Sequence, residues 1–191
     1  MNYQDFIDSK RFDHVSVGFD SQLSKYPLFD YQEPIVKWAL KRGKAAIFAD
    51  TGLGKTIMQL TWADQVAEKT NAPVLILAPL AVASQTIEEG RKYGIHIEKL
   101  NPDADVFGRG IYIINYEQLH KVKNQFMGIA LDESSILKGM MGARRKEITD
   151  FAKGIPYRLS CTATPSPNDF MELGTQSEFL GIMSQIEMLA M

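Results

Sequence analysis

The residues best suited to chemistry in this chain lie between Ala49 and Thr56, which read ADTGLGKT. Glycines in such a loop let backbone N–H groups surround phosphate oxygens, and the helix that begins after the loop adds partial positive charge. The lysine reaches the β- and γ-phosphates, and the threonine hydroxyl binds Mg²⁺. Although Ala49 stands where the strict pattern has Gly, the loop predicts a nucleoside triphosphate site formed by Thr51, Gly52, Leu53, Gly54, Lys55 and Thr56.

A pair of carboxylates follows another apolar run, GIAL, well downstream of this loop. In P-loop ATPases an Asp at this place holds Mg²⁺, partly through water, and a neighbouring carboxylate can orient and deprotonate the attacking water. The pattern therefore predicts that Asp132 binds Mg²⁺ together with Thr56 and that Glu133 activates water. With Lys55, these two acids form the predicted catalytic set.

Short apolar runs that alternate with amphipathic ones must position these groups. Strands are expected at residues 45–49, 74–78, 111–115, 128–132 and 157–163, and helices at 31–43, 55–69 and 81–94. Such alternation predicts an α/β fold with a mostly parallel central sheet and helices on both faces. Ligands of such sheets collect at the carboxyl ends of the strands, which is where the polar motifs fall.

The composition of the 191 residues, 45% hydrophobic and 23% charged, is typical of one globular domain. The formal net charge of -2 offers no global field for nucleic acid, so any contact with it must be local. A single cysteine, Cys161, excludes an internal disulfide, and the three histidines have no recognised zinc spacing. We expect one domain over 1–191 with 1–30 as an N-terminal arm, in the cytoplasm and without a membrane partner.

Taken together, these motifs resemble those of the superfamily-two helicases and translocases, the DEAD/DEAH-type ATPases, and within them the Swi/Snf-like branch. The resemblance extends over residues 29–180 and implies a first RecA-like lobe that uses ATP and Mg²⁺. It implies nucleic acid as a partner, DNA more than RNA, and a second RecA-like lobe that is not expected in this chain. The segment FDYQ resembles the family's adenine-reading segment, which makes Gln32 the expected adenine reader.

Further segments resemble the family's nucleic-acid-contacting and coupling motifs. The expected residues are Pro79 and Gln85 after the second strand, Asn115 and Tyr116 after the third, and Thr162 and Thr164 in the TATP motif. Lys138, Asn168, Glu172 and Leu173 match the Swi/Snf-like pattern around the later motifs. Ser135 departs from that pattern, because His or Asp is usual there, and this puts in doubt how the acidic motif signals to nucleic acid.

Two other functions are compatible with the phosphate loop. One is a P-loop NTPase of another class, such as a small-molecule kinase or a protein-remodelling ATPase, and the other is a non-catalytic interaction module. The basic cluster Arg144, Arg145 and Lys146 is interpreted as a solvated helix face. Because family members complete the γ-phosphate site with arginines from the second lobe, the isolated chain is expected to bind nucleotide but to hydrolyse it poorly.

Overall fold

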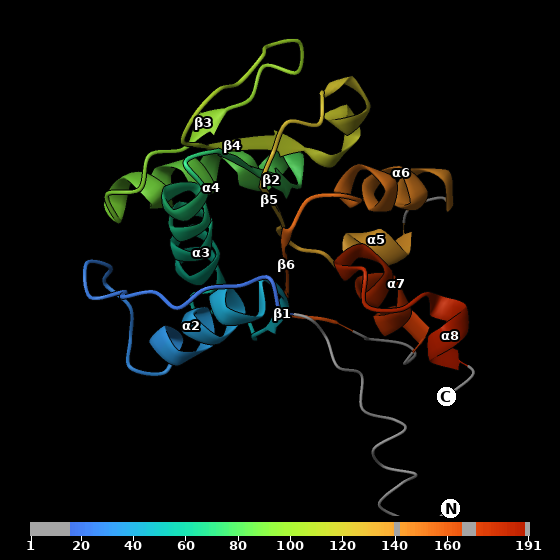
Figure 1. Cartoon of the computed structure of the whole chain (residues 1–191), viewed down its shortest axis with the longest axis horizontal. Helices are drawn as coiled ribbons and strands as arrows, with labels where there is room; N and C mark the ends of the chain where they lie inside the picture. The colour runs from blue at the N-terminus through green and yellow to red at the C-terminus, as the bar shows by residue number, and fades with distance from the viewer. Residues whose placement is uncertain (1–15, 140–141, 166–170, 190–191) are drawn as a thin grey trace, which may run out of the picture.

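The computed structural model describes residues 16–139, 142–165 and 171–189. Within these residues, six strands run parallel in one sheet with the order β1-β6-β5-β2-β4-β3 (Figure 1). The strands are β1 (Lys44–Phe48), β2 (Pro73–Ala78), β3 (Glu98–Lys99), β4 (Gly110–Asn115), β5 (Gly128–Leu131) and β6 (Tyr157–Thr162). The predicted parallel α/β fold is confirmed, and the five strands expected from the sequence are all present.

Helices cover both faces of the sheet, with α2, α3 and α4 on one side and α5 to α8 on the other (Figure 1). Their bounds are α2 (Gln32–Arg42), α3 (Lys55–Thr70), α4 (Leu80–Lys92), the 3₁₀ helix η1 (Tyr116–Lys121), α5 (Ile136–Gly139), α6 (Gly142–Ala152), α7 (Met171–Leu180) and α8 (Gln185–Leu189). The three predicted helices correspond to α2, α3 and α4.

Alternate residues of the central strand β2 supply the two cores. Val74 and Ile76 pack in the layer that contains α2 and α3, whereas Leu75 and Leu77 pack in the layer that contains α7. All six β2 residues are buried, as expected for a strand with helices on both sides. A continuous apolar run at VLILA is the consequence of this double burial.

The segment before α2, expected as part of an N-terminal arm, packs against the fold where the structure describes it. Leu23 is 1% exposed, and the Tyr26 hydroxyl donates to the Asp64 carboxylate on α3 at 2.6 Å. Residues 1–15 lie outside the described residues. Within the described residues, no helix is both long enough and apolar enough to span a bilayer.

The buried face of α2 differs from what its apolar residues suggest. Ile35, Trp38, Ala39 and Leu40 lie at helical spacing, but the Trp38 side chain is 50% exposed, and the buried residues are Gln32, Val36, Ala39 and Leu40. Trp38 lies with Pro34, Ile35 and Phe48 along a groove of about 480 Å³ beside β1. Because β1 pairs only with β6 among the described strands, it forms an open edge of the sheet.

Parallel pairing brings the sequence motifs to one edge. Since all strands point the same way, the loops after β1, β2, β4, β5 and β6 leave the sheet at its carboxyl edge. These are the loops that begin at Ala49, Pro79, Tyr116, Asp132 and Ala163. Five segments that are far apart in the sequence therefore share one edge of the sheet.

Candidate ATP site

The phosphate loop joins β1 to α3 in a conformation that depends on glycine. Gly54 precedes α3 with φ 71° and ψ 40°, in the left-handed region, and Gly52 has φ 85°. Residues that carry a side chain rarely adopt such backbone angles, so glycine avoids strain at both positions. The Lys55 ammonium lies within the loop, where it donates to the carbonyls of Ala49 at 2.8 Å and Asp50 at 3.2 Å.

Gln32 is fixed against this loop. Its side chain is 1% exposed, its Nε2 donates to the Leu53 carbonyl at 3.0 Å, and its Oε1 accepts from the Phe29 N–H at 2.9 Å. A Cβ on Gly54 would lie 2.3 Å from the Gln32 Nε2, so close packing is a second reason for glycine there. The structure thus packs Gln32 against the P-loop and uses both ends of its amide.

Two exposed aromatic rings lie beside Gln32. Phe29 and Tyr31 are 68% and 46% exposed and stack with centroids 6.0 Å apart and planes 13° from parallel. The Tyr31 hydroxyl donates to the Leu53 carbonyl at 3.2 Å, so this pair is attached to the P-loop as well. The sequence analysis assigned no role to these rings. The signal available was two aromatic residues, two positions apart, directly before Gln32.

Asp132 follows β5 and carries a buried carboxylate, with the residue 9% exposed. Burial, and next the neighbouring Glu133 carboxylate, raise the pKa of Asp132 to about 6, while the Lys55 ammonium acts in the opposite direction. The phosphate loop follows β1 and the acidic pair follows β5, so both leave the carboxyl edge of the same parallel sheet.

Glu133 has a backbone that few residues other than glycine adopt. Its φ is 52°, in the left-handed region, which costs of order 1–3 kcal/mol for such a residue. The following residue, Ser134, is hydrogen-bonded through its N–H, its hydroxyl and its carbonyl, which restricts the backbone at Glu133.

The protein groups available for Mg²⁺ are oxygen donors. The Thr56 hydroxyl and the Asp132 carboxylate are the hard ligands that Mg²⁺ prefers. No cluster of three or more His, Cys, Asp or Glu side chains that could hold a metal occurs among the described residues. This donor set fits an ion held by few protein ligands together with phosphate oxygens, which is the usual arrangement for Mg²⁺ at nucleotides.

Tyr116 lies next to the acidic pair but inside the protein. It is 3% exposed, and its hydroxyl donates to the Asp132 carbonyl at 2.7 Å. Burial and the Asp132 charge raise the pKa of Tyr116 well above its ordinary value, so the hydroxyl stays a donor. Of the two roles expected for this residue, nucleic-acid contact or coupling, only coupling is compatible with its burial.

The other residues expected to contact nucleic acid or to couple lie at the same edge. Pro79 precedes α4, and the Gln85 amide is exposed and donates to the Glu89 carboxylate at 2.9 Å. The Asn115 side chain accepts from the Gln118 N–H at 3.0 Å and caps η1. Thr162 is buried and its hydroxyl accepts from the N–H of the exposed Thr164 at 3.1 Å. Asn168 and the side chains of Lys138 and Glu172 lie outside the described residues.

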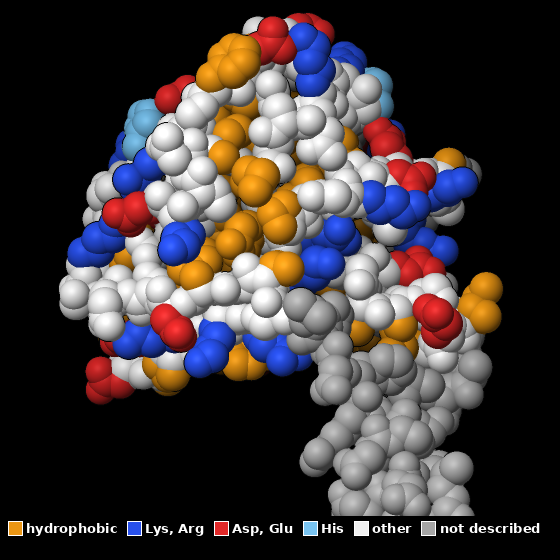
Figure 2. All heavy atoms as spheres, in the orientation of Figure 1, with side chains coloured by type: hydrophobic (Ala, Val, Ile, Leu, Met, Phe, Trp, Pro, Cys, Tyr) orange, Lys and Arg blue, Asp and Glu red, His pale blue; other side chains and the backbone are white. Residues whose placement is uncertain are grey.

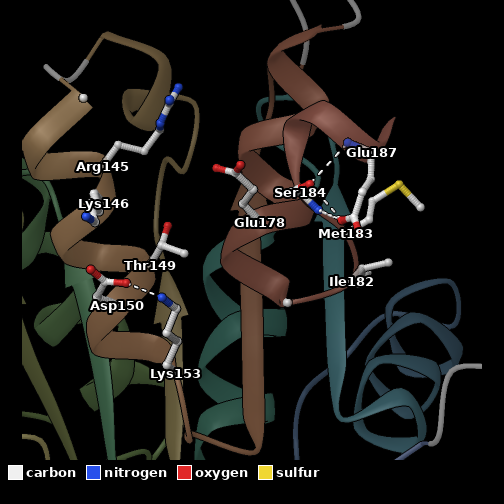
Figure 3. A pocket seen from close by; sticks show the side chains of 12 residues that line it. Arg145, Lys146, Thr149, Asp150, Lys153, Glu178, Ile182, Met183, Ser184 and Glu187 are labelled. Atoms are coloured by element: carbon white, nitrogen blue, oxygen red, sulfur yellow. Dashed lines mark hydrogen bonds and ion pairs between the residues drawn. The ribbon is translucent and has the colours of Figure 1, made fainter. Parts of the chain in front are cut away.

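The surface offers no broad basic field for nucleic acid on the side that can be followed in the space-filling view. Figure 2 shows Lys and Arg side chains interspersed with Asp and Glu across that face. The cluster Arg144–Lys146 lies on α6, where Arg145 and Lys146 line a cleft of about 630 Å³ opposite Glu178 and Glu187 (Figure 3). None of the predicted ATP-site residues lines this cleft.

Sequence reasoning missed a polar network directly behind the acidic pair. Ser134, Ser160 and Gln176 are buried and hydrogen-bonded to one another. A signal was available, because Ser160 interrupts an apolar strand and Ser134 follows the acidic pair at once. Only the fold shows that Gln176, sixteen residues beyond Ser160, reaches the same place.

Comparisons with known proteins agree with this geometry. The family described as "Type III restriction enzyme, res subunit" matches residues 25–167. A Caenorhabditis elegans homolog of the SWI/SNF-related matrix-associated actin-dependent regulator of chromatin subfamily A-like protein 1 is 31% identical over 163 residues, which cover 78% of this chain and 23% of that protein. The chain thus spans about a quarter of the length of this relative.

Solved structures show the same fold. The Sulfolobus solfataricus SWI2/SNF2 ATPase core in complex with dsDNA is similar to this chain with a TM-score of 0.72 and 21% identity. The match covers 94% of this chain and 41% of the Sulfolobus chain. The UvsW helicase from bacteriophage T4 matches 96% of this chain and 66% of its own, with a TM-score of 0.66 and 16% identity.

The family match, taken with the fold, identifies the chain as the first RecA-like lobe of a superfamily-two helicase or translocase. Within that class, the chain belongs to the family of the type III restriction enzyme res subunit, whose pattern covers most of its length.

The raised pKa of Asp132 predicts a pH-dependent stability. Since the folded protein holds this proton up to about pH 6 and the unfolded chain releases it near 3.8, stability falls as pH rises through this window. Ionisation of Asp132 at pH 7 should lower the free energy of unfolding by about 3 kcal/mol. In urea unfolding with a chelator present, Asp132→Asn should therefore be the more stable protein at pH 7 and equal to wild type at pH 4.

An exposed acid, Asp103, provides the control, because Asp103→Asn should shift stability little at either pH. A difference between wild type and Asp132→Asn that stays constant from pH 4 to pH 7 would contradict the assignment of this ionisation to Asp132.

Proposed function

We propose that this lobe binds Mg-ATP and, together with a second RecA-like lobe, hydrolyses it in response to nucleic acid, DNA more than RNA. The observation that carries the proposal is that the phosphate loop and Asp132 leave the same carboxyl edge of the parallel sheet, after β1 and β5. Membership of the family favours this function over a kinase, a protein-remodelling ATPase or a non-catalytic module.

Each residue of the site has a proposed role. Lys55 and the N–H groups of residues 51–56 bind the phosphates, and the Thr56 hydroxyl and Asp132 hold Mg²⁺, Asp132 partly through water. The bound ion would neutralise charge on the phosphates. Glu133 orients and deprotonates the attacking water.

The adenine is proposed to lie near Gln32 and the aromatic pair Phe29 and Tyr31. The bonds to Phe29 and Leu53 fix the Gln32 amide, and its Nε2 also donates to the Tyr31 hydroxyl at 3.4 Å. A base would replace this long bond, with N7 accepting from Nε2 and the N6 amine donating to Oε1. The exposed rings of Phe29 and Tyr31 offer a flat apolar surface for stacking.

The nucleic acid is proposed to contact Pro79, Gln85, Asn115 and Thr164 at the same edge, while Tyr116 and Thr162 couple from inside. A relative solved with double-stranded DNA supports DNA as the partner. A few local contacts with phosphate would give weak binding with a shallow salt dependence. A cytoplasmic location remains a prediction from the single cysteine.

Completion of the site by a second lobe is proposed because the relatives are longer than this chain. Two of its arginines are also already engaged. Arg109 donates to the Asp64 carboxylate at 2.8 Å, and Arg158 donates to the carbonyls of Ile155 and Phe179. Neither is free to meet the γ-phosphate.

Loss of the P-loop lysine should weaken nucleotide binding. Charge-assisted hydrogen bonds contribute about 1.5–3 kcal/mol, so Lys55→Ala should lower the affinity for Mg-ATP by about tenfold or more. Titration calorimetry measures this directly. Lys92→Ala, in the last turn of α4, removes the same charge elsewhere and should bind like wild type. Equal affinity in wild type and Lys55→Ala would refute the P-loop assignment.

The base preference tests Gln32 without altering the P-loop that it supports. GTP and ITP both present O6 where ATP presents an N6 amine, and such a mismatch costs about 1–3 kcal/mol. In competition with a fluorescent ATP analogue, both should bind about tenfold or more weakly than ATP. If ITP competes as well as ATP and only GTP is weak, exclusion of the guanine 2-amino group is responsible and Gln32 is not the reader.

Turnover by the 191-residue chain should be slow and unaffected by DNA. An arginine from a second lobe is worth a factor of about 10³ to 10⁵, and without it the charge that develops on the γ-phosphate is incompletely met. Phosphate release at saturating ATP should be low with or without single- or double-stranded DNA. Glu133→Gln should lose the remaining rate, while Glu88→Gln on α4 should keep it.

Rapid turnover by the wild-type chain that Glu133→Gln abolishes would contradict the proposal that a second lobe completes the site. It would mean that an arginine of this chain, or of a self-associated copy, completes the site.

A further inference from the structure

Three buried polar side chains form a closed hydrogen-bond network directly behind the acidic pair. Ser134 and Ser160 are 0% exposed and Gln176 is 3% exposed. The two serine hydroxyls are hydrogen-bonded at 2.8 Å, and the Ser160 hydroxyl also bonds the Gln176 Oε1. The Gln176 Nε2 in turn donates to the Ser134 carbonyl at 3.2 Å. The network therefore joins the loop after β5 to β6 and α7.

Ser134 is bound at each of its polar groups. Besides its hydroxyl and carbonyl, its N–H donates to the Cys161 carbonyl of β6 at 2.9 Å. The preceding residue is Glu133, whose left-handed φ of 52° is unfavourable without support from its surroundings. A residue held at its N–H, hydroxyl and carbonyl leaves the neighbouring backbone little freedom to relax.

We propose that Gln176 is a positioning residue for ATP hydrolysis. Through Ser134 and Ser160 it fixes the acidic loop on β6 and α7 and so determines where the Glu133 carboxylate lies. This inference rests on the proposed ATPase function. Gln176 itself acts through Ser134 and touches neither nucleotide nor water in this role.

The same network provides a route from the acidic pair to the TATP motif. Among the described residues, the side-chain hydrogen bonds between the acidic loop and β6 come from Ser134 and not from Ser135. Ser160 lies two residues before Thr162 on the same strand. Arg158 ties this strand to α7 a second time by donating to the Phe179 carbonyl at 2.8 Å. A shift of β6 and α7 is thereby passed directly to Ser134.

Removing the Gln176 amide should change hydrolysis but not nucleotide binding. Gln176→Met keeps a similar shape, removes the bond to the Ser134 carbonyl and leaves the Ser160 hydroxyl without its amide partner. The phosphate loop contains none of these groups, so affinity for Mg-ATP should stay within about twofold. Misplacement of a catalytic group by about 1 Å can cost a factor of about 10², so the rate of hydrolysis should fall by about ten- to hundredfold.

The experiment compares wild type, Gln176→Met, Ser160→Ala and their double variant. Ser177→Ala is the control, because this neighbour on α7 bonds Met183 and not the acidic loop. Single-turnover hydrolysis with protein in excess over ATP gives the rate, calorimetry gives the affinity, and hydrogen exchange by mass spectrometry gives local protection. Exchange should accelerate at residues 132–137 and stay unchanged at 49–56. The double variant should be no slower than the slower single variant.

Three results would overturn the inference. Exchange that rises equally at 132–137 and 49–56 would show a general loss of stability, and exchange that does not change at 132–137 would show that the network does not hold the loop. A local rise in exchange with an unchanged rate would show that the loop's position does not limit hydrolysis. If Lys55→Ala binds Mg-ATP as tightly as wild type, the proposed ATPase function itself fails, which these other outcomes do not imply.

Discussion

At neutral pH the Asp132 carboxylate is charged at a position that is only 9% exposed, and no ion pair among the described residues offsets it. The nearest compensation comes from Lys55, which bonds to carbonyls of its own loop. A buried charge without a direct partner lowers the stability of the fold and favours binding of a cation. The phosphate loop and the hydrogen bonds that support the acidic pair all lie next to this unfavourable charge.

The backbone around Asp132 is held from both sides of the sheet's edge. Tyr116 supports it from the β4 side by bonding the Asp132 carbonyl, and the Ser134 network supports it from β6 and α7. Ligand groups that are fixed before binding need not be ordered when the ligand arrives, so less of the binding energy is spent on ordering. A desolvated carboxylate can therefore keep one position although it repels its neighbour Glu133.

Much of the fold was predictable because its signals are local. A doubly covered parallel strand must be apolar along its length, so β2 could be recognised from VLILA alone. The phosphate loop could be recognised because its glycines, lysine and threonine are contiguous. The same locality explains why the strand ends, and with them Asp132 and Thr162, could be assigned to one edge from the sequence alone.

Other features could not be predicted because they depend on contacts between distant segments. The face that α2 buries is set by α3 and β1, so the periodicity of its apolar residues did not reveal that Trp38 points outward. Gln176 has no motif of its own, and its role exists only where α7 crosses behind β5 and β6. The burial of Tyr116 likewise follows from the packing of η1 and not from the sequence INYE.

The open edge of the sheet has a practical consequence for any work with this lobe in solution. Along β1 the side of the strand that no other described strand pairs adjoins the apolar groove that contains Trp38 and Phe48, and the strand carries neither a proline nor a charge beyond Lys44. Natural proteins usually blunt such edges, because an unblunted strand is a template for pairing with another chain. Purified samples should be handled at low concentration and checked by light scattering, since oligomers formed through β1 would lie beside the phosphate loop and distort ligand titrations.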